Sequence, residues 1–109
     1  MIIATLRMAA RPEKREEVEQ IVRGILESTR VQRGCQSYSF CQDVEDANSY
    51  FILEQWATQA DLEEFIRSKS YRKLLAAMEL LSEPPEVKIN AISYTAGLEA
   101  IKAARQCDD

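Results

Sequence analysis

The order of the predicted strands and helices indicates an α+β fold of the ferredoxin-like kind. Four segments alternate apolar and polar residues as strands do, and helical regions separate the first strand from the second and the third from the fourth. A short polar segment joins the second strand to the third, which is typical of a hairpin. This β-α-β-β-α-β order predicts a four-stranded antiparallel sheet with helices on one face.

The N-terminal third of the chain predicts the first strand and the first helix. Residues 2–8 alternate between two faces, and Pro12 suits the first turn of the helix that follows. Apolar residues recur at helical spacing over residues 18–26, so the helix has one apolar face and is expected to end before Gly34. Gly24 destabilises this helix by about 1 kcal/mol relative to alanine unless another group packs closely against it.

Residues 35–57 predict a β-hairpin. Its first strand, residues 35–42, places Cys35 and Cys41 on one face, the polar segment 43–49 turns the chain, and the remainder forms the third strand. Because free cysteines on a strand face pack as small apolar side chains, we assign no redox role to either of them.

The fourth strand follows two further helical runs. Thr58 is expected to cap the first run, and a break around residues 68–70 separates it from the second. Pro84 and Pro85 stop the second run, and residues 87–94 form the fourth strand.

Residues 1–94 are expected to form a single domain, which a chain of 109 residues with 46% apolar content can support. The C-terminal tail, residues 95–109, predicts a short helix because Leu98, Ile101 and Ala104 follow helical spacing.

Charge and hydropathy exclude several classes of protein. The 18 acidic residues outnumber the 14 basic ones and give a net charge of −4, whereas a nucleic-acid-binding domain needs a basic face for the phosphates. No apolar run approaches the roughly 20 residues of a membrane-spanning helix. The three cysteines are too few and odd in number for a disulfide framework, which predicts a cytoplasmic protein.

The chain has no histidine, and this excludes several kinds of site. Neither a Ser-His-Asp nor a Cys-His nucleophile can form, and neither zinc nor haem can have an imidazole ligand. Cys35 and Cys41 alone provide too few thiolates for a zinc site. We therefore predict no metal site and no cofactor, and any catalysis depends on carboxylates, Tyr, Arg, Trp, Cys or the substrate itself.

The pattern of the strands predicts a second copy of the chain. The third strand carries Phe51 and Leu53 on the face opposite Ile52 and Trp56. The apolar residues of the fourth strand are likewise divided, with Val87, Ile89 and Ala91 on one face and Ile92 and Tyr94 on the other. Because helices cover only one face, we expect a homodimer in which two sheets pack face to face.

Glu54 and Trp56 are the first candidate site residues, since alternation puts both on one face of the third strand. Under the helices, Trp56 either lines a cavity or is a large core residue whose N–H is satisfied. An ionised Glu54 on an inner face needs a partner or a raised pKa. The simpler alternative is that Glu54 lies at the rim of the sheet or forms a salt bridge with an arginine such as Arg7.

Four more aromatic residues are candidates for contact with a flat aromatic ligand, and each has an alternative place in the core. Phe65 has the spacing of a core residue, and Tyr71 could place its ring in the core and its hydroxyl in a cavity. Tyr38 and Phe40 share a strand face that could instead belong to the sheet or dimer core.

Several features between residues 34 and 75 occur together in one known family. They are Gly34-Cys35 at the start of a strand, an acidic turn at residues 43–46, the Phe51-Ile52-Leu53-Glu54-Gln55-Trp56 strand, and the helical residues from Leu62 to Ser68 with Tyr71 beyond. In these features the chain resembles the antibiotic biosynthesis monooxygenase family of small dimeric α+β barrel proteins. With the element order, the resemblance covers residues 1 to about 94.

The resemblance implies an activity and roles for residues. Members include oxygenases that oxidise quinols or polyketide phenols without metal or flavin, in which the phenolate itself reduces O₂ while the protein supplies deprotonation, orientation and a dry cavity. Trp56 matches the family tryptophan that lines the pocket, and Glu54 matches the carboxylate before it. Where the family often has two histidines, this chain has Phe65 and Ser70.

Other relatives degrade haem with an asparagine on the first strand, the tryptophan and an axial histidine. This chain keeps only Trp56 of these residues, so the resemblance does not imply haem degradation.

Two functions of different classes follow. The first is a cofactor-independent monooxygenase that oxidises a small aromatic, a quinol or polyketide-type phenol, with O₂. In this enzyme Trp56 and Phe65 would form walls of the substrate pocket, and Glu54 would act as the base that deprotonates the substrate. Tyr71 or Arg7 would contact a substrate oxygen. Glu54, Tyr71 or a self-ionising substrate could provide deprotonation, and the sequence does not choose among them. The second function is a non-catalytic dimeric protein that binds a small apolar ligand or acts as an accessory.

Overall fold

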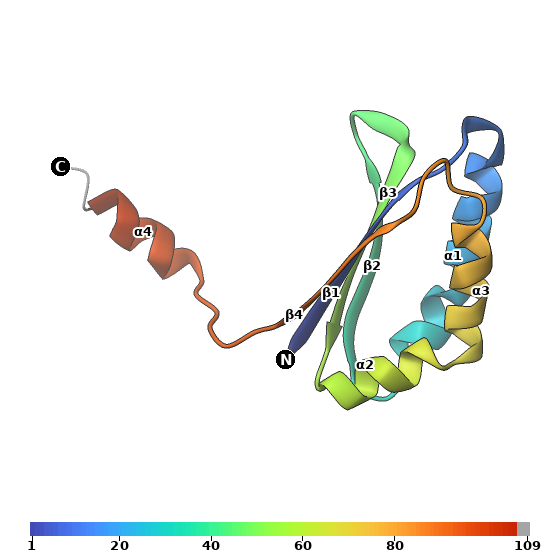
Figure 1. Cartoon of the computed structure of the whole chain (residues 1–109). Helices are drawn as coiled ribbons and strands as arrows, with labels where there is room; N and C mark the ends of the chain where they lie inside the picture. Colours follow the sequence, from blue (N-terminus) through green and yellow to red (C-terminus); the bar gives the residue numbers. More distant parts are fainter. Residues whose placement is uncertain (107–109) are drawn as a thin grey trace.

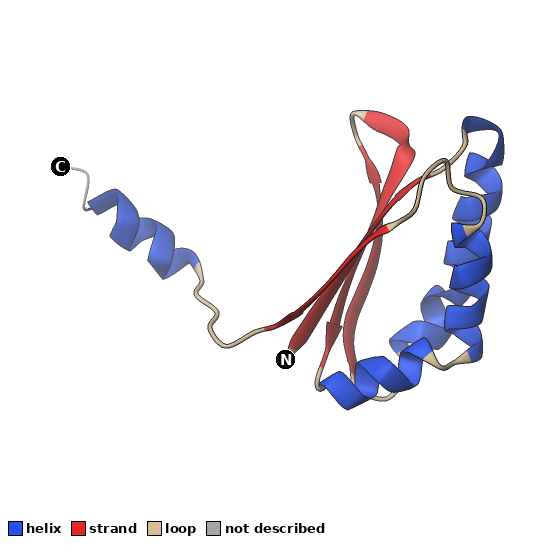
Figure 2. Cartoon of the chain, viewed as in Figure 1, coloured by secondary structure: helices blue, strands red, loops and turns tan. Residues whose placement is uncertain are grey.

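The computed structural model describes residues 1–106. The elements follow in the order β1 (Ile2–Ala9), η1 (Pro12–Lys14), α1 (Arg15–Arg30), β2 (Cys35–Asp43), β3 (Asp46–Trp56), α2 (Gln59–Ile66), α3 (Lys69–Met78), β4 (Glu86–Ala91) and α4 (Leu98–Gln106). The strands form one antiparallel sheet in the order β2-β3-β1-β4, and α1, α2 and α3 cover one of its faces (Figures 1 and 2). The predicted ferredoxin-like α+β fold is confirmed.

The helix boundaries follow the predicted sequence signals. Thr58 caps α2 by accepting a hydrogen bond from the backbone N–H of Asp61 over 3.1 Å, and Ser68 caps α3 in the same way. Gly34 has a φ of 81°, in the left-handed region that favours glycine, and an added Cβ there would collide with Asp61. This conformation turns the chain from α1 into β2.

The core fills the space between the sheet and the helices. Alternate residues of β1 and β3 point into it, and α1, α2 and α3 each contribute apolar residues at helical spacing. Ile66 of α2 and Leu75 of α3, which their spacing predicts to point inward, are instead exposed. Its fully buried large side chains are Trp56, Tyr50, Phe65, Met8, Ile25, Ile52, Leu62 and Leu74.

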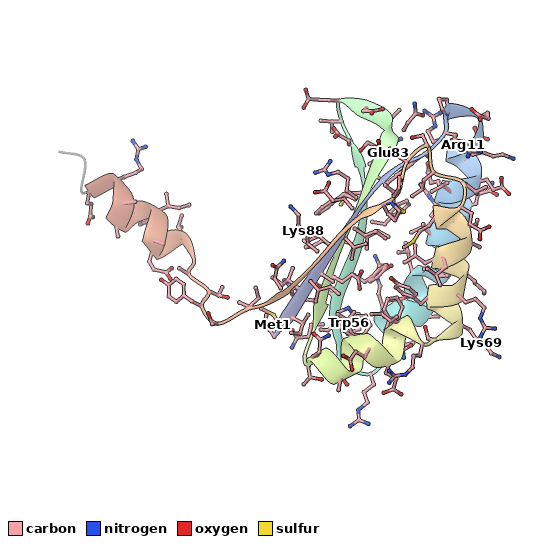
Figure 3. All side chains as sticks on the ribbon, viewed as in Figure 1. Met1, Arg11, Trp56, Lys69, Glu83 and Lys88 are labelled. Carbon is pink, nitrogen blue, oxygen red and sulfur yellow. The ribbon has the colours of Figure 1, made fainter. Side chains whose placement is uncertain are left out.

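The opposite face of the sheet, called here the uncovered face, carries Ile3, Arg7, Phe51, Leu53 and Lys88. Register pairs Arg7 with Phe51 and Thr5 with both Leu53 and Lys88, so these residues share that side. Figure 3 shows Lys88 on the side of the sheet away from the helices.

Two predictions about the strands are wrong. A register shift between Cys35 and Ser37 places Cys35 opposite Trp56, on the helix face, whereas Cys41 pairs with Phe51 on the uncovered face. The two thiols therefore lie on different faces. Strand β4 ends at Ala91, so Ile92 and Tyr94, the residues expected to make its second face apolar, follow the strand.

Helix α4 confirms the helix predicted in the tail. It lies away from the rest of the molecule, on the side of the sheet opposite α1, α2 and α3, and none of its side chains is buried (Figure 1). The last part of the predicted tail, residues 107–109 with Cys107, lies outside the described residues. Within residues 1–106, no helix combines the length and the apolar character needed to cross a membrane.

Candidate functional site

Glu54 is a buried acidic residue on the helix face of β3. Register places it beside Ala4 of β1 and Tyr38 of β2. Its Oε1 accepts a hydrogen bond from the indole Nε1–H of Trp56 over 2.9 Å. Both side chains lie on one strand face, as the alternation predicts.

Arg7 does not neutralise Glu54, so the alternative of a salt bridge between them is wrong. Arg7 lies on the uncovered face, where its guanidinium carbon is 5.4 Å from the centre of the Phe51 ring. No lysine or arginine in the described part of the chain forms an ion pair with Glu54. The sheet separates Arg7 from the other predicted site residues.

Burial raises the pKa of Glu54 to about 7, and the hydrogen bond from Trp56 partly opposes this shift. The carboxyl group is therefore divided between its neutral and charged forms near neutral pH. A pKa in this range suits a general base, because the group can take a proton from a weak acid and return it under the same conditions.

Phe65 lies at the centre of an aromatic cluster beside Glu54. Trp56 stacks on it with ring centres 4.9 Å apart and planes at 25°, and Tyr71 meets it edge to face at 5.4 Å. Tyr38 contacts the same ring edge to face at 5.9 Å. Figure 3 shows Trp56 in the space between the sheet and the helices.

The hydroxyl group of Tyr38 is buried and has no hydrogen-bond partner among the described residues. Burial raises the pKa of Tyr38, and the nearby charge of Glu54 raises it further. The same two causes raise the pKa of Tyr71. Both phenols remain protonated near neutral pH, and of the two only Tyr71 lines the pocket together with Glu54, where its hydroxyl can serve as a hydrogen-bond donor.

A pocket opens next to this cluster at the edge of the sheet. Ala4, Leu6 and Glu54 form its floor, Leu62, Ile66 and Tyr71 its roof, and Val87 and Ile89 the side nearest the solvent. Its volume is about 300 Å³ when the space open to solvent is included, and its enclosed part accommodates a group of about the size of one water molecule.

The structure brings five of the seven predicted site residues together. Glu54, Trp56, Phe65, Tyr71 and Tyr38 form one contiguous group, of which Glu54 and Tyr71 line the pocket. Trp56 takes the second of the two roles considered from the sequence, because it is a fully buried core residue whose N–H is satisfied by Glu54, and it does not line the pocket.

Phe40 belongs to a different part of the core. It stacks on Tyr50 with ring centres 5.2 Å apart, and the Tyr50 hydroxyl donates to Oε2 of Glu19 over 2.9 Å. The pocket walls Val87 and Ile89 were not predicted as site residues. Val87 and Ile89 lie beside Leu6 and Ala4 because the first strand pairs with the last. The expected pairing of these two strands is therefore the sequence signal that could have identified them as site residues.

Residues 1–77 match the family model described as antibiotic biosynthesis monooxygenase. The chain belongs to the antibiotic biosynthesis monooxygenase family. The matched residues include Glu54, Trp56, Phe65 and Tyr71, whereas the β4 side of the pocket lies beyond them.

Individual relatives agree with this membership. The uncharacterised protein sll1783 of Synechocystis is 30% identical over 86% of this chain, and the match spans only 65% of that relative's length. A Bacillus subtilis protein named "Putative monooxygenase YcnE" is 27% identical over 80% of this chain and 93% of its own. The crystal structure of a conserved protein from Methanosarcina mazei shares the fold with a TM-score of 0.77, at 26% identity over 82% of this chain and 89% of that one.

Proposed function

We propose that the chain is a cofactor-independent monooxygenase that oxidises a small hydroquinone or related phenol with O₂. The observation that carries this proposal is the position of Glu54, a carboxyl group with a pKa of about 7 on the floor of a largely apolar pocket. Family membership supports the monooxygenase class, and the chemistry of the pocket supports the choice of substrate.

The shape of the pocket supports one orientation of the substrate. The aromatic ring lies in the mouth, against Ile66, Val87 and Ile89, and one hydroxyl group enters the enclosed part toward Glu54. Tyr71 donates a hydrogen bond to the substrate oxygen from the opposite wall. The enclosed part of the pocket has room for a hydroxyl group but not for the ring.

The reaction needs no external reductant, because the substrate supplies all four electrons that O₂ accepts. Glu54 takes the hydroxyl proton, and the anion passes one electron to O₂. The two radicals join through a carbon–oxygen bond, and Glu54 returns the proton to give a hydroperoxide. Glu54 then removes the hydrogen of that carbon as the O–O bond breaks, and the proton joins the departing hydroxide. The products are one hydroxyquinone and one water.

A homodimer through the uncovered faces is the second part of the proposal. Ile3, Phe51 and Leu53 provide an apolar centre for this interface, although β4 contributes Glu86 and Lys88 rather than the apolar residues expected. Light scattering after size exclusion should give twice the chain mass of 12.4 kDa. Leu53→Glu should shift the protein toward monomer, and Gln20→Glu, which adds the same charge to an exposed residue of α1, should not. A monomeric parent protein would contradict this interface.

Oxygen uptake tests the activity. The purified chain is mixed with hydroquinones and anthrone-like phenols without nicotinamide, flavin or added metal. Consumption of one O₂ per hydroxyquinone formed from a hydroquinone, or per quinone formed from an anthrone, is expected, with no hydrogen peroxide accumulating. Tyr71→Phe should lower the rate, whereas Tyr50→Phe, which removes a phenol hydroxyl away from the pocket, should not. A folded parent protein that consumes no O₂ across the panel would overturn the monooxygenase proposal.

The small enclosed part of the pocket and the close aromatic packing around Phe65 favour one alternative, a non-catalytic protein that binds a small apolar ligand. Quenching of Trp56 fluorescence by a ligand, without turnover, would support it. The odd number of cysteines supports the cytoplasm as the location for either function.

A further inference from the structure

The mouth of the pocket is lined by apolar side chains that the chain itself leaves exposed. Val87 and Ile89 are 50% and 47% exposed, and Ile66, across the mouth, is 37% exposed. β4 is one of the two edge strands of the sheet, and every one of its residues is exposed. An apolar rim of this kind is typical of a surface that another element covers.

Helix α4 has an apolar face that its own chain does not cover. Leu98 and Ile101 are 64% and 59% exposed, and helical spacing places Lys102 and Arg105 one turn further along the same face, four residues after Leu98 and Ile101 respectively. In Figure 1, α4 lies beyond the uncovered face, whereas the pocket is between the sheet and the helices on the other side. The position of α4 is therefore one that a second copy on the uncovered face would approach.

We propose that α4 of each subunit covers the mouth of the other subunit's pocket, so that the site is complete only in the dimer. This inference rests on the sheet-to-sheet dimer proposed above. Leu98 and Ile101 then pack against Ile66, Val87 and Ile89 of the partner subunit, and the two exposed apolar surfaces cover each other.

The connection between β4 and α4 is long enough for this exchange. Residues 92–97 separate the two elements, and six extended residues span about 20 Å. Packed sheets are about 10 Å apart. Since the pocket opens at the edge strand, the connection has to pass only the edge of the partner's sheet.

The charges of the two surfaces are complementary. Helix α2 presents the exposed acidic residue Glu63 three positions before Ile66, and α4 presents Lys102 and Arg105 one turn beyond Leu98 and Ile101 on the same face. Opposite charges at the border of an apolar contact favour one orientation of the partner over others. Covering the mouth also removes water from above Glu54, which strengthens electrostatic interactions in the site.

Disulfide trapping tests the contact in the full-length chain. In a background with Cys35→Ala, Cys41→Ser and Cys107→Ser, Ile89→Cys is combined with Ile101→Cys and the protein is mildly oxidised. A disulfide requires Cα atoms within about 7 Å of each other. The main product expected on a non-reducing gel is a covalent dimer of twice 12.4 kDa. The matched control combines Ile89→Cys with Ala103→Cys, which lies on the other side of α4 and should trap little dimer.

The remaining outcomes separate this inference from the dimer itself. A disulfide within one chain, equal trapping by the Ala103→Cys control, or no trapping in a protein that light scattering shows to be dimeric would each overturn the exchange of α4. A monomer by light scattering would overturn the dimer and the exchange together.

Discussion

The indole N–H of Trp56 donates to a carboxyl oxygen of Glu54, two residues earlier on the same strand. The bond holds Oε1, while Oε2 receives no hydrogen bond from any residue in the described range. Trp56 itself is held by its stack on Phe65. The carboxyl group is thus oriented by one oxygen and available for proton transfer through the other.

Glu54→Gln should lower kcat by about 10²–10⁴-fold with a much smaller change in KM, because glutamine keeps the acceptor for Trp56 but cannot take a proton. In the parent protein, the rate should rise with pH and level off above the Glu54 pKa of about 7. Steady-state kinetics from acid to alkaline pH measures both effects. Unchanged turnover in a folded Glu54→Gln protein would leave a self-ionising substrate as the source of the anion.

The free energy of unfolding should depend on pH through Glu54. Its pKa is raised from 4.5 to about 7 on folding, so the folded state holds the proton more tightly than the unfolded state. The resulting stability is complete below the unfolded pKa and is lost as pH rises through the folded pKa. Relative to Glu54→Gln, the parent should lose about 3 kcal/mol between acid and alkaline pH in urea titrations. A pH-independent difference between the two proteins would show that Glu54 does not titrate as inferred.

Trp56→Phe distinguishes the effect of the Trp56 hydrogen bond from the effect of Trp56 packing. Phenylalanine keeps a ring against Phe65 but has no donor, so the pKa of Glu54 should rise and the pH–rate profile should move to higher pH. Trp56→Ala should instead reduce the free energy of unfolding by about 3–5 kcal/mol, as expected for truncation of a buried tryptophan. A profile that does not move in Trp56→Phe would mean that the bond has no effect on proton transfer.

Gly24→Ala should stabilise the protein by about 0.5–1 kcal/mol, because nothing lies within 4 Å of an added Cβ and alanine favours a helix. Gly34→Ala provides the contrast, since its positive φ and the collision with Asp61 should make it destabilising. Thermal denaturation of the two variants measures the difference in sign.

Much of this architecture could be predicted because it depends on local patterns. Alternation predicted that Glu54 and Trp56 share a face, and helical spacing predicted that Phe65 points into the core. Alternation could not predict that Cys35 lies on the helix face rather than on the same face as Cys41. The bulge beside Cys35 depends on pairing with β3 rather than on the residues of β2.

The site was less predictable than the fold because its walls come from distant parts of the chain. Arg7 and Glu54 belong to adjacent strands, and only the register and the face of each strand determine that they are separated by the sheet. The orphaned hydroxyl of Tyr38 and the width of the pocket depend on three-dimensional packing, for which the sequence has no periodic signal.

The pairing of β1 with β4 joins the two ends of the domain, with Ile2 opposite Ala91. Pairing residues so far apart in sequence requires a long loop to close, and the entropy lost in closing it slows folding. During synthesis, β1 is made before β4 and remains without this neighbour until β4 has been made. The wall formed by Val87 and Ile89 is therefore added after the β2–β3 hairpin and the helices α1, α2 and α3, so a growing chain has these elements before it has a pocket.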